Sequence, residues 1–182
     1  IDHGITRKSF ERMGIRKIDD YFHTFRQLGL FGHFERGLIT EKQFFFRLRK
    51  YFPNTVKTKE IIDAWNSMIL DLPHDNLEFL GKLKNHYRIF LMSNANNTHI
   101  KIIDDNIKKN YGYEGINPFF NKTYYSYACR LSKPDPEFFK LILKEQNLDP
   151  AKTLFIDDCR ENIKSASVLG FKTLHYTSIP RK

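Results

Sequence analysis

Two adjacent carboxylates, Asp157 and Asp158, follow the short apolar run 154–156. Neighbouring carboxylates at the end of a buried strand repel each other and lose solvation, so a cation or a basic group is expected beside them. Oxygen ligands suit Mg²⁺, which usually keeps several waters and shares its coordination shell with a phosphate. The alternative is that Asp158 caps the helix that follows, and the two roles are compatible. We favour a metal site formed by this pair.

Ser93 and Asn94 end another apolar run, 88–92. A hydroxyl and backbone N–H groups that lead into a helix can hold a phosphoryl oxygen, although Ser93 could instead only cap that helix. Lys133 stands before Pro134 in a stiff loop that can aim its ammonium group at a phosphate or at a carboxylate nucleophile. The alternative for Lys133 is an ordinary solvated lysine on the surface. Ser93, Asn94 and Lys133 are therefore the candidate catalytic residues.

Four short strands are predicted to carry these groups at or near their ends. Each of the first three runs is followed by a segment of helical periodicity, and such alternation is typical of a parallel sheet covered by helices. Ligands bind beyond the carboxyl ends of strands in such sheets, where the candidate residues lie in the sequence. We predict an α/β, Rossmann-like core over 73–182, with strands at 88–92, 124–127, 153–156 and 172–175.

The N-terminal part of the chain has a different pattern, because its aromatic residues recur at helical spacing. Thr40 followed by Gln43 is typical of a helix N-terminus with a capping box. A second amphipathic helix is expected to begin at Thr58, and Pro53 interrupts the pattern between them. The sequence therefore predicts an α-helical domain over 3–72.

Composition excludes several classes of protein. Of 182 residues, 41% are hydrophobic and 15% are aromatic, which excludes a disordered chain, and two cysteines cannot form a disulfide scaffold. We find no apolar run long enough to cross a membrane and no signal peptide, so we expect a cytoplasmic protein without a membrane partner. The formal net charge of +9 suits an anionic ligand.

The same charge allows a different class of function, a non-catalytic binding protein that uses a basic surface. Arg47, Arg49 and Lys50 lie among aromatic residues such as Phe46. Aromatic residues on helices are more often core, however, and no nucleic-acid-binding motif is present, so no nucleic-acid partner is expected. Nothing in the sequence indicates an oligomeric state.

Taken together and in this order, the motifs resemble those of the haloacid dehalogenase-like (HAD) hydrolase superfamily. Ser93 matches the second motif of that family, Lys133 the third, and Asp157 with Asp158 the fourth. The helical segment 3–72 is similar to the α-helical cap that these enzymes insert after their first strand. Three short sequences look closest to the bacterial sugar-phosphate phosphatases: Glu35-Arg36-Gly37, Ser93-Asn94-Ala95-Asn96 with His99, and Lys133-Pro134-Asp135-Pro136.

The resemblance implies a Mg²⁺-dependent phosphatase that hydrolyses a small phosphorylated metabolite through an aspartyl-phosphate. Ser93 and nearby N–H groups would bind phosphoryl oxygens, Lys133 would offset charge, and Asp157 and Asp158 would hold Mg²⁺, with Asp158 the direct ligand. The alternative activity on this fold is a haloacid dehalogenase, which needs no metal, and the Asp157-Asp158 pair argues against it. The candidate substrate-binding residues are His23, His33, Glu35, Arg36 and Asn162.

The first motif of the family, a nucleophilic aspartate at the end of the first strand, has no match in this sequence. Asp2 stands before Gly4 as in some first motifs, but Ile1 alone cannot supply the strand that would position its carboxylate. We therefore expect the nucleophile upstream of Ile1 and the chain as given to lack it. In the family this strand is central in the sheet, so its absence would leave unpaired backbone groups on the neighbouring strands.

Overall fold

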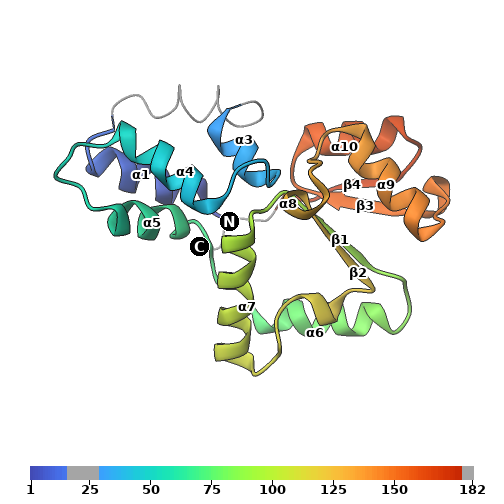
Figure 1. Ribbon diagram of the computed structural model, residues 1–182. Helices are drawn as coiled ribbons and strands as arrows, with labels where there is room; N and C mark the ends of the chain where they lie inside the picture. The colour runs from blue at the N-terminus through green and yellow to red at the C-terminus, as the bar shows by residue number, and fades with distance from the viewer. Residues whose placement is uncertain (16–28, 178–182) are drawn as a thin grey trace. The chain divides into compact units, whose positions relative to one another are not determined.

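The computed structural model describes residues 1–15 and 29–177, which divide into two compact units, 1–128 and 129–182 (Figure 1). Each unit is considered by itself below. The predicted boundary near residue 72 between a helical domain and an α/β core stays a prediction. Of the helices in the described ranges, none has the length and apolar character needed to cross a membrane.

Helices form the N-terminal part of the first unit, as predicted, and local caps explain where they begin. The side chain of Asp2 accepts a hydrogen bond from the N–H of Gly4 and caps the first helix. Thr40 and Gln43 form the predicted capping box at the start of another. The elements are α1 (His3–Arg12), α3 (Leu30–Glu35), α4 (Glu41–Leu48), the 3₁₀ helix η1 (Arg49–Tyr51) and α5 (Thr58–Asn66).

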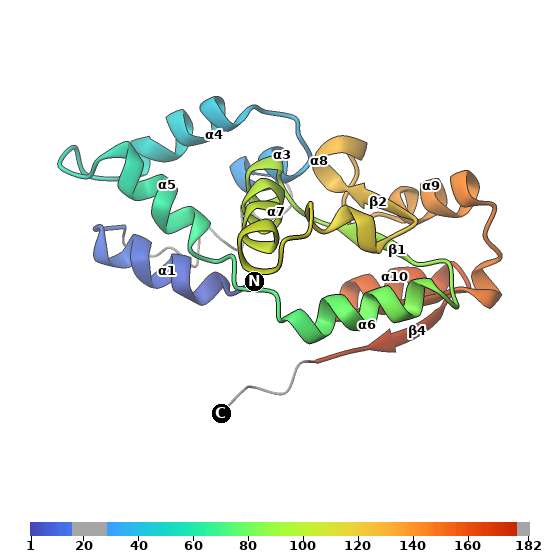
Figure 2. The same cartoon turned by 90° about the horizontal axis from the view of Figure 1, so that it is seen from below.

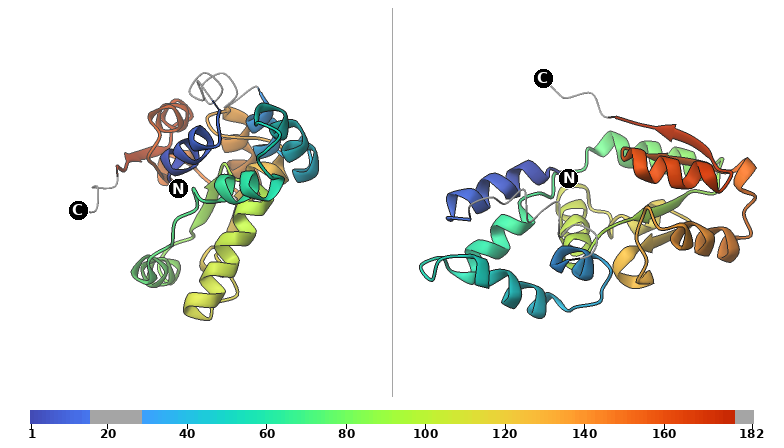
Figure 3. Two further views of the ribbon diagram at one scale, coloured as in Figure 1. Left: turned by 90° about the vertical axis from the view of Figure 1, so that its left-hand side faces the viewer. Right: turned by 90° about the horizontal axis from the view of Figure 1, so that it is seen from above.

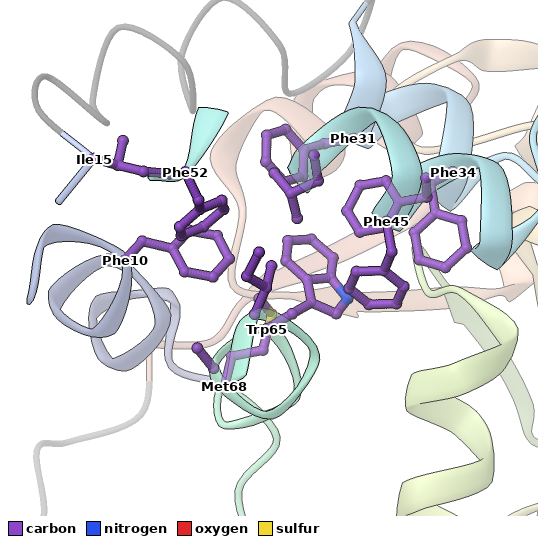
Figure 4. Close-up of a cluster of buried hydrophobic side chains, with 12 residues drawn as sticks. Phe10, Ile15, Phe31, Phe34, Phe45, Phe52, Trp65 and Met68 are labelled. Carbon is purple, nitrogen blue, oxygen red and sulfur yellow. The ribbon is translucent and has the colours of Figure 1, made fainter. Parts of the chain in front are cut away.

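A cluster of mostly aromatic side chains holds these helices together (Figure 4). Phe44 is fully buried and lies 4.3 Å from Phe34 and 4.9 Å from Trp65, measured between ring centroids. The Thr6 hydroxyl donates to the carbonyl of Ala64, which joins α1 to α5. Burial of several large rings supplies the main driving force for packing short helices that would be marginal alone. Most of the described N-terminal aromatic residues are therefore core, as their helical spacing predicts, whereas Phe46 and Tyr51 are exposed.

The rest of the first unit contains a pair of parallel strands. Phe90 pairs with Lys122 and Ser93 pairs with Tyr125. The sequence predicts the second strand at 124–127, but in the structure it ends at Tyr125. Tyr125 pairs with Ser93, which is the last residue of the first strand, and a helix begins at Ser126. The elements are α6 (His74–Lys84), β1 (Phe90–Ser93), α7 (Asn97–Tyr111), η2 (Asn117–Phe119), β2 (Lys122–Tyr125) and α8 (Ser126–Cys129). Leu77 and Ile107 form a second small core, against which Leu91 of β1 packs.

The second unit also has two parallel strands, with Leu154 paired to Lys172 and Asp157 paired to His175. Helix α10 packs on both strands, and Figures 2 and 3 show it beside β4. Gly170 lies just after this helix with a φ of +88°, a left-handed conformation that glycine adopts without strain and that often ends a helix. The elements are α9 (Pro136–Gln146), η3 (Pro150–Lys152), β3 (Leu154–Asp157), α10 (Arg160–Val168) and β4 (Lys172–His175).

The strand and helix order confirms the predicted α/β class with parallel pairing. The four strands described here form two separate two-stranded sheets, β1 with β2 and β3 with β4. Within the described residues, β1 and β3 therefore each have a strand partner on one side only. The predicted central strand between them stays a prediction.

Candidate active site

A buried ion pair joins two of the candidate residues at the carboxyl end of β3. The Nζ atom of Lys133 lies 2.7 Å from Oδ2 of Asp157, and the two side chains are 12% and 6% exposed. Nζ also lies 5.8 Å from the ring centroid of Phe155, on whose face the ammonium group sits. The alternative that Lys133 is an ordinary solvated lysine is therefore wrong, because its side chain is buried and forms an ion pair with Asp157.

Both oxygens of Asp157 are hydrogen-bonded. Oδ2 accepts from Lys133, while Oδ1 accepts from the backbone N–H of Cys159 at 2.8 Å and from Nδ2 of Asn162 at 2.9 Å. Burial raises the pKa of Asp157, but the Lys133 ammonium and these hydrogen bonds together outweigh burial, and the net pKa is below its usual value. Asp157 is accordingly a fixed, ionised carboxylate at neutral pH. Asn162, a candidate for substrate binding, contacts Asp157 in the structure.

Asp158 has a different environment from its neighbour. Its side chain is exposed and makes no hydrogen bond within the described part of the chain. The alternative that it caps the following helix is wrong, because Cys159 is the N-cap residue of α10 and the carboxylate that accepts from the Cys159 N–H belongs to Asp157. The charges of Asp157, Asp158 and Lys133 sum to one negative charge, which favours a cation at the free carboxylate of Asp158.

The donor set at this strand end fits Mg²⁺ of the kind bound by one or two carboxylates together with a phosphate and waters. Within residues 1–15 and 29–177, no group of three or more histidine, cysteine or acidic side chains is close enough to hold a metal ion. A closed protein cage, typical of structural zinc, is therefore not formed by the described residues. Ligation of a metal ion by Asp157 or Asp158 stays a prediction, and Asp158 is the one of the two whose carboxylate makes no hydrogen bond within the described residues.

Ser93 and Asn94 lie at the end of β1 in the other unit, and both are partly buried. The alternative that Ser93 caps the next helix is wrong: Asn96 is the N-cap residue of α7, and its side-chain oxygen accepts from the N–H of His99. Within the described residues the Ser93 hydroxyl makes no hydrogen bond, so it remains available for a ligand. The prediction that Ser93 shares one site with Lys133 and Asp157, which belong to the other unit, is not tested by either unit alone.

The candidate substrate-binding residues of the helical segment fall in different places. Glu35 and Arg36 lie at the end of α3, where Nε of Arg36 donates to the Gly32 carbonyl. His33 lines a separate surface depression together with Arg47 and Lys50. His23 lies outside the described residues. Substrate contact by any of them stays a prediction.

A family model of haloacid dehalogenase-like hydrolases matches residues 5–170. The chain belongs to this hydrolase family. The match covers most of the sequence and includes Ser93, Lys133, Asp157 and Asp158. The family predicted from the motifs is thereby confirmed, and with it a hydrolase on the HAD fold.

Relatives of this HAD-like hydrolase include a D-ribitol-5-phosphate phosphatase from Bacteroides thetaiotaomicron, 27% identical over 95% of this chain and 84% of the relative. A HAD family enzyme from the same organism, solved as an aspartate-to-alanine mutant with magnesium and inorganic phosphate, is 34% identical and superposes with a TM-score of 0.87 over 97% of this chain and 87% of the other. A HAD-like hydrolase from Porphyromonas gingivalis is 25% identical, with a TM-score of 0.82 over 95% of this chain and 82% of the other. L-2-haloacid dehalogenase from Xanthobacter autotrophicus has a similar fold, with 19% identity over 92% of this chain and 69% of the other and a TM-score of 0.55.

Two residues of this HAD-like hydrolase have roles that sequence reasoning did not assign. The sequence predicts Ser126 in a strand, yet its fully buried hydroxyl bonds to both Ala95 and Glu35. His99 is part of the motif that starts at Ser93, and in the structure its ring is buried and stacks on Trp65 with ring centroids 5.3 Å apart. The motif spacing was a signal for His99. For Ser126 no sequence signal exists, because its partners lie 31 and 91 residues away.

The buried ring of His99 is expected to make the fold sensitive to mild acid. Burial, and secondarily the charge of His3, lowers the pKa of His99 to about 4. The unfolded chain, with a pKa near 6.5, binds the proton more readily, so the stability due to a neutral His99 is present above about pH 6.5 and is lost as the pH falls towards 4. The expected loss is on the order of 2 kcal/mol.

This prediction is measured by urea denaturation of the wild type and of His99→Phe between pH 4.5 and 7.5. Phenylalanine keeps a ring against Trp65 but does not titrate, so the pH dependence of its unfolding free energy should be shallower than that of the wild type. Equal slopes in the two proteins would show that His99 does not control the acid response.

Proposed function

We propose that this protein is a Mg²⁺-dependent phosphomonoesterase that acts on a small phosphorylated metabolite. The relative named as a D-ribitol-5-phosphate phosphatase makes phosphorylated polyols and sugars the first substrates to test. The observation that carries the proposal is that two adjacent carboxylates have different environments. Asp157 is held at 2.7 Å by a buried lysine, whereas Asp158 is exposed and unbonded within the described residues.

Each residue of the candidate site has a defined part in this chemistry. Asp158 would hold Mg²⁺, which when bound neutralises charge on the phosphoryl oxygens. Asp157 fixes the Lys133 ammonium, and Lys133 offsets negative charge that develops as the phosphoryl group is transferred. The Ser93 hydroxyl and the neighbouring N–H groups would donate hydrogen bonds to phosphoryl oxygens. Catalysis on this account is mainly positioning and electrostatic stabilisation, as in other phosphoryl transfers.

We infer that the nucleophile is an aspartate other than Asp2. Asp2 follows no strand, and its side chain caps α1 by accepting a hydrogen bond from the N–H of Gly4. Its carboxylate is therefore not presented at a strand end, where ligands bind in parallel sheets.

The test is phosphate release by the full-length gene product from a panel of phosphorylated polyols and sugars, with magnesium and with EDTA. We expect release from at least one five-carbon phosphate in magnesium and almost none after chelation. Halide release from 2-chloropropionate, measured in parallel, should be absent. EDTA-insensitive halide release, or no hydrolysis of any phosphomonoester in magnesium, would overturn the proposal.

A further inference from the structure

The hydroxyl of Ser126 connects the loop after Ser93, the candidate phosphate-binding residue, to the end of α3, which carries candidate substrate-binding residues. It accepts a hydrogen bond from the backbone N–H of Ala95 at 3.0 Å and donates one to the backbone carbonyl of Glu35 at 2.6 Å. Ala95 belongs to the loop 94–96 that follows the candidate phosphate-binding Ser93, and Glu35 ends helix α3. Figure 1 shows α3 ending beside α8, which begins at Ser126.

The hydroxyl group is matched to this position. The Ser126 side chain is fully buried, and a buried polar group must be paired to avoid a desolvation penalty. A hydroxyl can donate one hydrogen bond and accept another, and both capacities are used here. The Ala95 carbonyl also lies within reach, at 3.1 Å, and the Glu35 carbonyl is the closer acceptor. An alanine could serve neither segment.

The backbone next to Ser126 packs closely against the same turn. Gly37 has a φ of +63°, a left-handed conformation that favours glycine. A Cβ atom at this position would overlap the backbone oxygen of Tyr127. The turn 35–37 is therefore pressed directly onto the backbone that carries Ser126, and no side chain can intervene.

Two further contacts hold the start of α7, next to the loop 94–96, against the N-terminal helices. The Thr98 hydroxyl donates to Oε2 of Glu41 on α4 at 2.9 Å. The ring of His99 stacks on Trp65 of α5. Helices α4 and α5 thus contact the segment 95–99 directly, and α3 is joined to it through the buried hydroxyl of Ser126.

We propose that Ser126 is a positioning residue that fixes the turn 35–37 relative to the phosphate-binding end of β1. The inference rests on the proposed function, because the turn carries the candidate substrate-binding residues Glu35 and Arg36. The spacing between this turn and Ser93 then selects phosphomonoesters whose hydroxyl-bearing leaving group spans from the phosphate site to the turn. A phosphate ester or anhydride with a very short leaving group does not reach the turn and is not selected.

The experiment compares Ser126→Ala with the wild type, both as full-length gene products, on ribitol 5-phosphate and on acetyl phosphate. For each protein we take the kcat/KM for ribitol 5-phosphate divided by the kcat/KM for acetyl phosphate. In Ser126→Ala this ratio should be about tenfold lower than in the wild type, because KM for ribitol 5-phosphate rises; this is the size of effect expected for one lost hydrogen bond. The rate on acetyl phosphate should change little. Ser67→Ala is the matched control, because its hydroxyl donates to the Ala64 carbonyl at 2.7 Å without joining two segments.

Gly37→Ala provides a second route to the same answer if Ser126→Ala does not fold. It displaces the turn without removing the Ser126 hydroxyl, so the same ratio should fall. An equal loss on both substrates, or an unchanged ratio in the variant that folds, would overturn the positioning role. If the wild type hydrolyses no phosphomonoester of the panel in magnesium, the proposed function fails, and this inference fails with it.

Discussion

Replacement of Asp158 by alanine is expected to reduce magnesium-dependent phosphate release by at least about a hundredfold at limiting magnesium, the scale of loss when one electrostatic contact to a transition state is removed. The reason is that Asp158 offers the free carboxylate of the site, whereas both oxygens of Asp157 are already hydrogen-bonded. The measurement is kcat/KM as a function of magnesium concentration, together with calorimetric titration of the protein with magnesium alone.

The stability of this variant separates metal binding from a structural role. Asp158 is exposed and its side chain has no hydrogen bond within the described residues, so the melting temperature without metal should be almost unchanged. Asp105→Ala, at an exposed position on α7, is the matched control and should bind magnesium as the wild type does. Wild-type magnesium affinity in Asp158→Ala would exclude Asp158 as the ligand.

The second large effect is expected for Lys133→Met, which should lower both activity and stability. Activity should fall about a hundred- to a thousandfold, because the cation that offsets charge on the phosphoryl group is lost. The unfolding free energy should fall by about 3 kcal/mol, because the Asp157 carboxylate, only 6% exposed, keeps its charge without its lysine partner. Steady-state kinetics and urea denaturation measure the two losses separately.

A double variant distinguishes these two losses. In Lys133→Met combined with Asp157→Asn, no buried charge is left unpaired, so most of the stability should return while activity stays low. The asparagine can still accept hydrogen bonds from Cys159 and Asn162 through its side-chain oxygen. If the double variant were no more stable than Lys133→Met, the ion pair would not be the origin of the stability loss.

The candidate site residues of unit 129–182 could be picked out from the sequence because each of them lies in a local pattern. Asp157 and Asp158 follow an apolar run and Lys133 precedes Pro134, which are local patterns. The sequence also singled out Asp158 as the direct metal ligand, and that assignment remains a proposal. What the pattern could not show is that Lys133 is buried against Asp157, since this contact spans 24 residues and depends on how α9 and α10 pack.

Helix positions were predictable for the same reason, and errors appeared where tertiary contacts decide. The capping box at Thr40 and the end of the last strand at His175 were correct because caps and apolar runs act locally. The second strand was predicted two residues too far along the chain, because its end is set by pairing with Ser93 of β1.

By itself the sequence determined the HAD-like family, the α/β class and the identity of the motif residues, because motif spacing, strand periodicity and helix caps are properties of neighbouring residues. Tertiary structure alone decided which carboxylate is paired and which is free, and that a single buried hydroxyl at Ser126 joins Ala95 to Glu35. Burial and long-range hydrogen bonds arise only when distant segments pack together, so no local pattern encodes them.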